Sequence, residues 1–230
     1  MIDVIAFDAD DTLWHNEPMF QATEGQFAEM LSSYHSAEWV RQRLFATEMK
    51  NLEHFGYGIK GFVLSMIETA IELTEGRVSG TEVQQIITWG HAMLTNPVEL
   101  LDGVRETVQS LAPSYRLMLL TKGDLFDQEA KLARSGLGEL FHAVEIVSVK
   151  NASTYRTLMQ RHGVIPERFV MVGNSLRSDV LPALEAGAKA VHIPYFTTWA
   201  HEHLEEEALQ GKEFAVLERI AMLPEWLAAR

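Results

Sequence analysis

The sequence predicts an α/β protein, with a parallel sheet that carries helices on both faces and an all-helical segment inserted after the first strand. Two observations support this prediction. Short runs of β-branched and other apolar residues recur along the chain, and in its C-terminal part they alternate with amphipathic helical patterns. Between the first run and the rest, residues 14–95 contain only helical patterns.

Composition narrows the possible classes of protein. The 230 residues are 47% hydrophobic and 22% charged, as in a globular protein of one large or two unequal domains. The chain has 0 Cys, which excludes disulfides, thiol nucleophiles and cysteine zinc sites and favours a reducing, cytoplasmic location. A net charge of -13 argues against a nucleic acid polymer or a membrane surface as partner. No apolar run approaches the roughly 20 residues of a spanning helix, and the N-terminus lacks signal-peptide features.

The first predicted strand is Val4–Phe7, an apolar run suited to burial on both faces of a sheet. Helical spacing of apolar residues follows it in four segments, which are 18–33, 36–54, 60–75 and 80–95. We therefore expect a helical cap at 14–95. The α/β core would then be discontinuous, made of residues 1–13 and 96–230.

The C-terminal part predicts further strands and helices in alternation. The predicted strands are Leu117–Leu120, Ile146–Val149, Phe169–Val172 and Ala190–Ile193, with Phe214–Leu217 as a candidate sixth strand at an edge. The predicted helices are Gly103–Leu111, Asp124–Ser135, Ser153–His162 and Ser175–Ala186. This alternation is typical of βα units and predicts a Rossmann-like parallel sheet.

Polar residues follow four of the predicted strands. In a parallel sheet the carboxyl ends of the strands share one edge, where ligands bind at the point at which the strand order reverses. One such residue alone is usually a turn or a helix cap, but four groups with complementary chemistry indicate a site. The candidates are Asp8, Asp10, Thr121, Lys122, Gly123, Lys150, Asn174 and Asp179.

The chemistry of these candidates points to a metal and a phosphoryl group. Carboxylate and amide oxygens, without sulfur or suitably spaced histidines, favour Mg²⁺ over zinc. The Thr121 hydroxyl, the N–H groups of Lys122 and Gly123 and the Lys150 ammonium are suited to hold a phosphoryl group and its transition-state charge. An aspartate beside the metal is then able to act as a nucleophile.

At these residues the sequence resembles the haloacid dehalogenase superfamily of hydrolases, in the branch with a helical cap after the first motif. The resemblance covers the whole chain, and all four motifs occur in order and at the right spacing. The matching residues are Asp8-x-Asp10-x-Thr12, then Thr121, then Lys150, and finally Gly173-Asn174-Ser175 through Asp179.

The resemblance implies hydrolysis of a small phosphorylated metabolite through an aspartyl-phosphate. According to this resemblance, Asp8 attacks phosphorus, and Asp10 protonates the leaving oxygen and later activates water. Thr121 and Lys150 would hold the phosphoryl group. The cap implies a small substrate, because a closing lid excludes water and large molecules alike.

The resemblance also implies a Mg²⁺ site made of Asp8, the carbonyl oxygen of Asp10 and Asp179. Two residues depart from the family pattern. Asp11 stands where the family usually has glycine, and Asn174 stands where it often has a metal-binding aspartate. With Asn174 at the site, Mg²⁺ would meet fewer negative charges.

Three alternatives compete with the phosphatase. A dehalogenase of the same family would have no use for the proton donor Asp10, since displacing halide from carbon needs none. A phosphonate hydrolase would need a cap lysine to form an imine, and the cap offers only Lys50 and Lys60. A receiver-like signalling module also places acidic residues, a Thr and a Lys at strand ends, but its phosphoacceptor follows the third strand and it has no cap.

One further motif, Gly56-x-Gly58-x-x-Gly61, fits the dinucleotide-binding pattern but follows a helical segment instead of a strand. We therefore expect it to be a turn between two cap helices. Its neighbours Phe55, Tyr57 and Lys60 are the candidates for substrate specificity.

Overall fold

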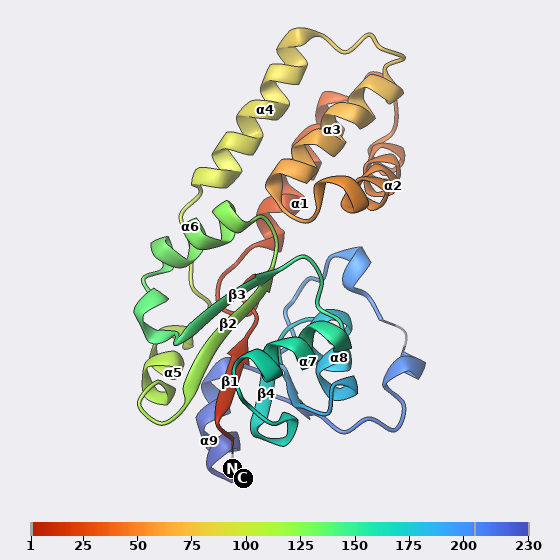
Figure 1. Cartoon of the computed structure of the whole chain (residues 1–230). Coiled ribbons are helices and arrows are strands. Elements are labelled where there is room, and N and C mark those ends of the chain that lie inside the picture. The colour runs from red at the N-terminus through yellow and green to blue at the C-terminus, as the bar shows by residue number, and fades with distance from the viewer. Residues whose placement is uncertain (1, 205, 230) are drawn as a thin grey trace. The chain divides into compact units, whose positions relative to one another are not determined.

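The computed structural model describes residues 2–204 and 206–229 (Figure 1). The chain divides into two compact units, which we call the sheet unit and the helical unit. The sheet unit comprises Met1–Glu17, Val98–Lys122 and Glu129–Arg230, and the helical unit comprises Pro18–Pro97 and Gly123–Gln128.

The sheet unit contains one parallel sheet, which has six strands in the described part of the chain, in the order β3-β2-β1-β4-β5-β6. Its strands are β1 Val4–Phe7, β2 Arg116–Lys122, β3 Ala143–Val147, β4 Phe169–Gly173, β5 Lys189–His192 and β6 Ala215–Val216. The predicted α/β class and parallel sheet are confirmed, including the short sixth strand at an edge.

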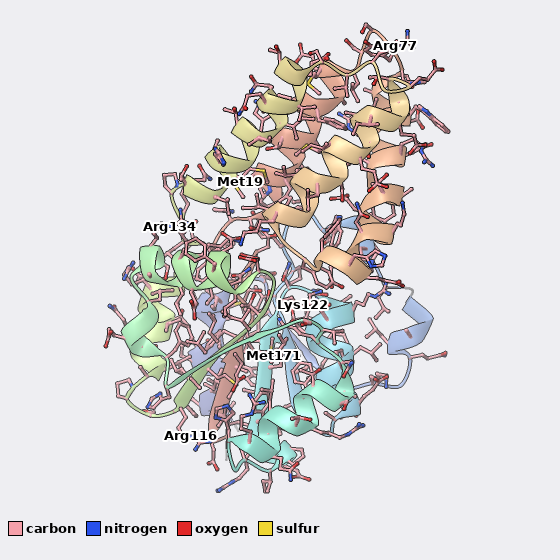
Figure 2. All side chains as sticks on the ribbon, turned by 45° about the horizontal axis from the view of Figure 1, so that its top comes forward. Met19, Arg77, Arg116, Lys122, Arg134 and Met171 are labelled. Atoms are coloured by element: carbon pink, nitrogen blue, oxygen red, sulfur yellow. The ribbon has the colours of Figure 1, made fainter. Side chains whose placement is uncertain are left out.

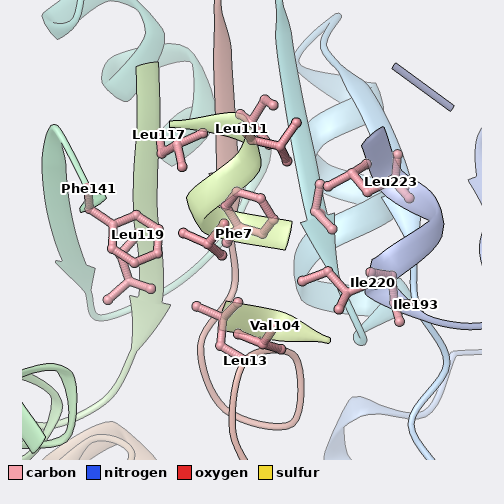
Figure 3. Close-up of a cluster of buried hydrophobic side chains, with 14 of the residues drawn as sticks. Phe7, Leu13, Val104, Leu111, Leu117, Leu119, Phe141, Ile193, Ile220 and Leu223 are labelled. Carbon is pink, nitrogen blue, oxygen red and sulfur yellow. The ribbon is translucent and has the colours of Figure 1, made fainter. Parts of the chain in front are cut away.

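Helices cover both faces of this sheet, because the side chains of a strand alternate between its faces. The helices along this part of the chain are α5 Val104–Leu111, α6 Leu125–Ser135, α7 Ala152–Arg161, α8 Leu181–Glu185 and α9 Leu223–Ala228. Ile5 and Phe7 pack into a cluster with residues of α5 and α9, and Figure 3 shows Phe7 in this cluster. Val4 and Ala6 pack into a second cluster with residues of α7 and α8. Short 3₁₀ turns at Gly138–Leu140, Pro166–Arg168, Ala200–Glu202, Glu206–Leu209 and Ile220–Met222 complete the connections.

Strand register brings the end of β1 to the centre of the sheet. Phe7 pairs with Leu119 of β2 on one side and with Val172 of β4 on the other. The next residue, Asp8, donates its backbone N–H to the Val172 carbonyl oxygen over 2.9 Å. Asp8 therefore leaves the sheet between β2 and β4, at the carboxyl edge. Figure 2 shows Lys122 at the carboxyl end of β2.

The bounds of the third predicted strand, Ile146–Val149, are wrong, because β3 spans Ala143–Val147 and so begins three residues and ends two residues earlier. It is an edge strand and only partly buried, with Val144 40% exposed, so a burial pattern locates it poorly. Its position follows from pairing with β2, in which Thr121 lies opposite Ile146. Lys150 consequently lies in the loop after β3.

The predicted helix Ser175–Ala186 is also wrong as a single element. It begins with a π-helical turn at Leu176–Val180 and continues as α8. Within it, the backbone N–H groups of Asp179 and Val180 both donate to the Ser175 carbonyl oxygen. Such π turns are rare and often occur at functional sites.

The helical unit contains the insertion after β1. Its helices are α1 Glu17–Met30, α2 Ala37–Phe55, α3 Ile59–Leu73 and α4 Gly80–Thr95. They bury a core of their own around Phe27, Leu44, Met66 and Ile86. Ser36 caps α2, and Ser79 caps α4 through a reciprocal bond with Glu82, which explains where these helices begin.

Among the described residues, no helix is both long and apolar enough to cross a bilayer.

Candidate active site

Three charged side chains meet at the carboxyl edge of the sheet. The Lys150 ammonium pairs with Asp8 Oδ1 and, at 2.7 Å, with Asp179 Oδ1. Asp8 follows β1, Lys150 follows β3 and Asp179 lies in the π turn after β4. Asp8, Lys150 and Asp179 are 8%, 5% and 1% exposed, so this cluster is buried. Strand ends far apart in sequence thus assemble one charged site.

Burial is the main influence on the charges of this cluster. It raises the pKa of Asp8 from its usual 3.8 to about 7, against the opposing attraction of Lys150 and with a further rise from Asp179. Burial would lower the pKa of Lys150, but Asp179 and Asp8 outweigh it and raise that pKa above its usual value. When Asp8 is ionised, two carboxylates around one ammonium leave a net negative charge, and the cluster is then suited to a further cation.

The position of Asp179 depends on the absence of a side chain at Gly173. Asp179 Oδ2 accepts a hydrogen bond from the Ser175 backbone N–H over 3.0 Å. A Cβ atom at Gly173 would lie 2.2 Å from that same oxygen. The carboxylate therefore occupies space that only glycine leaves open at the end of β4.

Thr12 contacts both Asp8 and Asn174. The Thr12 hydroxyl accepts a hydrogen bond from the Asn174 backbone N–H over 3.0 Å. Its Oγ1 atom lies 3.2 Å from Asn174 Oδ1 and 3.4 Å from Asp8 Oδ2, so it donates to one of these oxygens at a time. Thr12 thus links the loop after β1 to the loop after β4.

The donor set of this edge fits magnesium. In the described residues, no three Asp, Glu, His or Cys side chains form a group that holds a metal by themselves. The candidate set instead has two carboxylates, from Asp8 and Asp179, together with the amide oxygen of Asn174 and the backbone oxygen of Asp10. Mg²⁺ prefers oxygen ligands, usually takes only one or two carboxylates and keeps several waters.

Asp10 lies near Asp8, as its charge contributes to the raised pKa of that residue. Its own carboxylate faces different partners. Asp10 Oδ1 accepts hydrogen bonds from Trp14 Nε1 over 2.7 Å and from Lys131 Nζ over 3.0 Å. Lys131 also donates to Asn16 Oδ1 over 2.9 Å. Asp10, the predicted acid/base residue, is therefore paired with Lys131, whereas Asp8 is paired with Lys150.

Asp11 has a positive φ of 60°, a conformation that glycine adopts without steric cost. Its Oδ1 atom accepts the backbone N–H groups of Asn16, over 2.8 Å, and Glu17, over 3.1 Å, at the start of α1. Burial raises the pKa of Asp11 to about 7. Asp11 therefore caps the helix that follows the first motif.

The residues of the second motif lie at the carboxyl end of β2. Thr121 is buried, and its hydroxyl donates to the Lys122 carbonyl oxygen over 3.3 Å. The Lys122 ammonium pairs with Glu202 and donates to Ser178 Oγ over 2.9 Å. Gly123 follows with a φ of 137°, which glycine tolerates. The phosphate-binding roles of these residues remain predictions.

The three specificity candidates lie in the helical unit. The expected turn between α2 and α3 is confirmed, with Gly56 and Gly58 at φ values of 69° and 114°. Phe55 is exposed. Lys60 Nζ lies 2.9 Å from Asp124 Oδ1 in the same unit. The roles of Phe55, Tyr57 and Lys60 in substrate choice remain predictions.

Sequence reasoning missed Lys131, Trp14 and Glu202 as neighbours of the site. Trp14 lies only four residues after Asp10, so its closeness in sequence was a signal that could have indicated this contact. Lys131 and Glu202 join partners 121 and 80 residues away in sequence. No local pattern distinguishes such residues from ordinary helix and loop residues.

Comparison with known proteins shows which family the chain matches. Residues 2–187 match the haloacid dehalogenase-like hydrolases. The chain is also similar to a haloacid dehalogenase-like family hydrolase from Xanthomonas campestris, whose crystal structure shares 42% sequence identity and a TM-score of 0.87. That similarity covers 99% of this chain and 91% of the other.

Two curated relatives are phosphatases. Glyceraldehyde 3-phosphate phosphatase from Methanothermobacter thermautotrophicus is 34% identical over 119 residues, which cover 49% of this chain and 51% of that protein. N-acylneuraminate-9-phosphatase from Mus musculus is 26% identical over 201 residues, covering 82% of this chain and 81% of that protein. This chain thus matches about half the length of the first relative and most of the second.

Proposed function

The chain belongs to the haloacid dehalogenase-like hydrolases, and on this basis we propose that it hydrolyses a small phosphate monoester through an aspartyl-phosphate. The observation that carries the proposal is the buried cluster of Asp8, Lys150 and Asp179 at the carboxyl edge of the sheet. It combines a nucleophile, a fixed cation and a further carboxylate suited to a metal.

In this proposal an Asp8 carboxylate oxygen attacks phosphorus, and the bond from phosphorus to the leaving oxygen breaks. Asp10 gives its proton to that oxygen, so the alcohol leaves neutral. Asp10, now a carboxylate, then takes a proton from water as the water attacks the phosphorus of the aspartyl-phosphate. Phosphate is released and Asp8 is restored. Lys150 and Thr121 stabilise the charge on the phosphoryl oxygens.

Asp8, Asp179, Asn174 and the backbone oxygen of Asp10 would hold Mg²⁺. The family is generally magnesium-dependent, which supports this assignment. When bound, Mg²⁺ supplies positive charge that offsets repulsion between the carboxylates and the incoming phosphate. With one amide in place of a carboxylate, the site offers two side-chain charges, so we expect modest affinity for the ion.

The substrate class is a small phosphorylated metabolite. The two relatives described above are named glyceraldehyde 3-phosphate phosphatase and N-acylneuraminate-9-phosphatase, which supports this class. The net charge of -13 argues against nucleic acid as a substrate. We propose that the turn with Phe55, Tyr57 and Lys60 selects among leaving groups, because the core motifs serve only phosphate and metal.

The test is phosphate release from a panel of phosphorylated metabolites with Mg²⁺, with 2-haloacids included to test the dehalogenase alternative. Asp8→Asn should abolish turnover, because an amide is a poor nucleophile. The matched control is Asp3→Asn, in which the same change is made at a partly exposed residue paired with Arg168. Full activity of folded Asp8→Asn, or halide release without phosphate release in the wild type, would contradict the proposal.

A further inference from the structure

Glu202 is a carboxylate without a role in the proposed reaction, and it is bound by groups of two catalytic motifs. It lies in a 3₁₀ turn, Ala200–Glu202, between β5 and β6. Its side chain is only 13% exposed. Oε1 pairs with the Lys122 ammonium, and Oε2 accepts hydrogen bonds from the hydroxyls of Ser175 and, over 2.6 Å, Ser178.

These three partners come from separate strand ends. Lys122 ends β2 directly after Thr121, while Ser175 and Ser178 belong to the turn after β4. Lys122 also donates to the Ser178 hydroxyl over 2.9 Å, which closes the network. Glu202 therefore links the second motif to the fourth.

The turn held by Glu202 is the one that presents Asp179. The Ser178 backbone N–H donates to Ser175 Oγ over 2.9 Å. The Ser175 backbone N–H donates to Asp179 Oδ2 over 3.0 Å, and the Asp179 backbone N–H donates to the Ser175 carbonyl oxygen over 2.9 Å. A shift of Ser175 thus changes the position of the Asp179 carboxylate directly.

Glu202 also balances a charge next to the site. Burial would raise the pKa of Glu202, but Lys122 and the hydroxyls of Ser175 and Ser178 outweigh it and lower that pKa to about 2. Glu202 is therefore ionised near neutral pH. Its charge offsets that of the Lys122 ammonium, which follows Thr121 at the end of β2.

We propose that Glu202 is a positioning residue that holds the Ser175–Asp179 turn, and with it the carboxylate of Asp179, in the geometry required for Mg²⁺. The proposal rests on the magnesium site of the proposed function. Outer residues that orient metal ligands typically contribute 10- to 100-fold to metal affinity. The same range is expected for the effect of Glu202 on Mg²⁺ binding.

The experiment is calorimetric titration of the metal-free, full-length protein with Mg²⁺, without any substrate. Glu202→Ala should raise the Kd for Mg²⁺ by at least about 10-fold. Glu202→Gln should have a smaller effect, because an amide oxygen still accepts from the serine hydroxyls although the charge opposite Lys122 is lost. Glu213→Ala, which removes an exposed glutamate before β6, is the matched control and should leave the Kd unchanged.

A second measurement separates positioning from general stability. Far-UV circular dichroism should show that Glu202→Gln is folded at the titration temperature, and its Kd for Mg²⁺ should still rise. Unchanged Mg²⁺ binding in folded Glu202→Gln and Glu202→Ala would overturn the inference. A wild type that binds no Mg²⁺ would overturn it together with the magnesium site. A wild type that binds Mg²⁺ but hydrolyses no phosphate ester would refute only the phosphatase.

Discussion

Lys131 Nζ lies 3.0 Å from Asp10 Oδ1 and 3.3 Å from Asp10 Oδ2, in an ion pair in which the lysine side chain is 8% exposed. The lysine comes from α6 and the aspartate from the loop after β1. The proposed acid/base residue is thus held by a buried cation, in addition to the indole N–H of Trp14.

We expect Lys131→Met to lower kcat for phosphate monoesters by about 10-fold or more, a fraction of what general acid–base catalysis typically contributes. The reason is that Lys131 helps to hold the Asp10 carboxylate, which changes position when this contact is removed. Lys131→Arg should restore part of kcat because it keeps the charge. Lys189→Met, at an exposed lysine of β5, is the control. Equal kcat in Lys131→Met and the wild type would show that the ion pair has no part in turnover.

Gly173→Ala should reduce kcat/KM by about 100-fold, a loss that a misplacement of about 1 Å within a site is able to cause. Its Cβ atom would lie 2.2 Å from Asp179 Oδ2, so the carboxylate has to move. Gly25→Ala is the matched control, because a Cβ there meets nothing within 4 Å and alanine favours helix α1. Steady-state kinetics and a Mg²⁺ titration check both variants. Normal Mg²⁺ affinity in Gly173→Ala would mean that Asp179 is not a ligand.

Asn174→Asp should lower the Mg²⁺ concentration needed for half-maximal activity and raise the KM for a phosphate ester. The added carboxylate attracts the metal and repels the substrate. Each constant is measured with the other component saturating. The control is Asn151→Asp, the same change at the N-cap of α7, where aspartate is an equally good cap. An unchanged Mg²⁺ midpoint in Asn174→Asp would place residue 174 outside the metal site.

Lys60→Met should change the ratio of kcat/KM values among substrates of the panel, most for those with a second anionic group. Lys50→Met is the matched control. Each lysine is paired with a carboxylate of the helical unit, Lys60 with Asp124 at 2.9 Å and Lys50 with Glu68 at 2.7 Å. A proportional loss for every substrate in Lys60→Met would indicate an effect on stability and not on specificity.

The free energy of unfolding should depend on pH through Glu202. Its pKa is lowered from the usual 4.5 to about 2 in the folded protein, so the unfolded chain binds this proton more readily. The stabilisation is complete above about pH 4.5 and is lost as the pH falls towards about 2. It amounts to at most about 3.5 kcal/mol, since the pKa falls by about 2.5 units and one unit is worth about 1.4 kcal/mol.

Urea unfolding of the wild type and Glu202→Gln checks this dependence. The difference between their free energies of unfolding should be largest near neutral pH and should shrink at about pH 3. A difference that stays constant across this range would mean that Glu202 contributes by packing and not by charge.

The sequence alone determined the α/β class, the strand β1 at Val4–Phe7, the helical insertion and the sixth edge strand. These features are local, because burial on both faces of a central strand requires an apolar run and helical burial requires a regular spacing. The sequence did not predict the bounds of β3, Ala143–Val147, correctly, because an edge strand is half exposed and its register depends on its partner. It also missed the π turn, Leu176–Val180.

For the candidate site, too, the sequence determined some features and the tertiary structure determined others. The sequence placed Asp8, Lys150 and Asp179 after strands, and parallel strands necessarily bring such residues to one edge. Only the tertiary structure decided that one ammonium lies between both carboxylates, that Lys131 faces Asp10, and that Glu202 links two motifs. These contacts join residues dozens of positions apart, and their geometry comes from the packing of loops and helices, for which a single sequence contains no periodic signal.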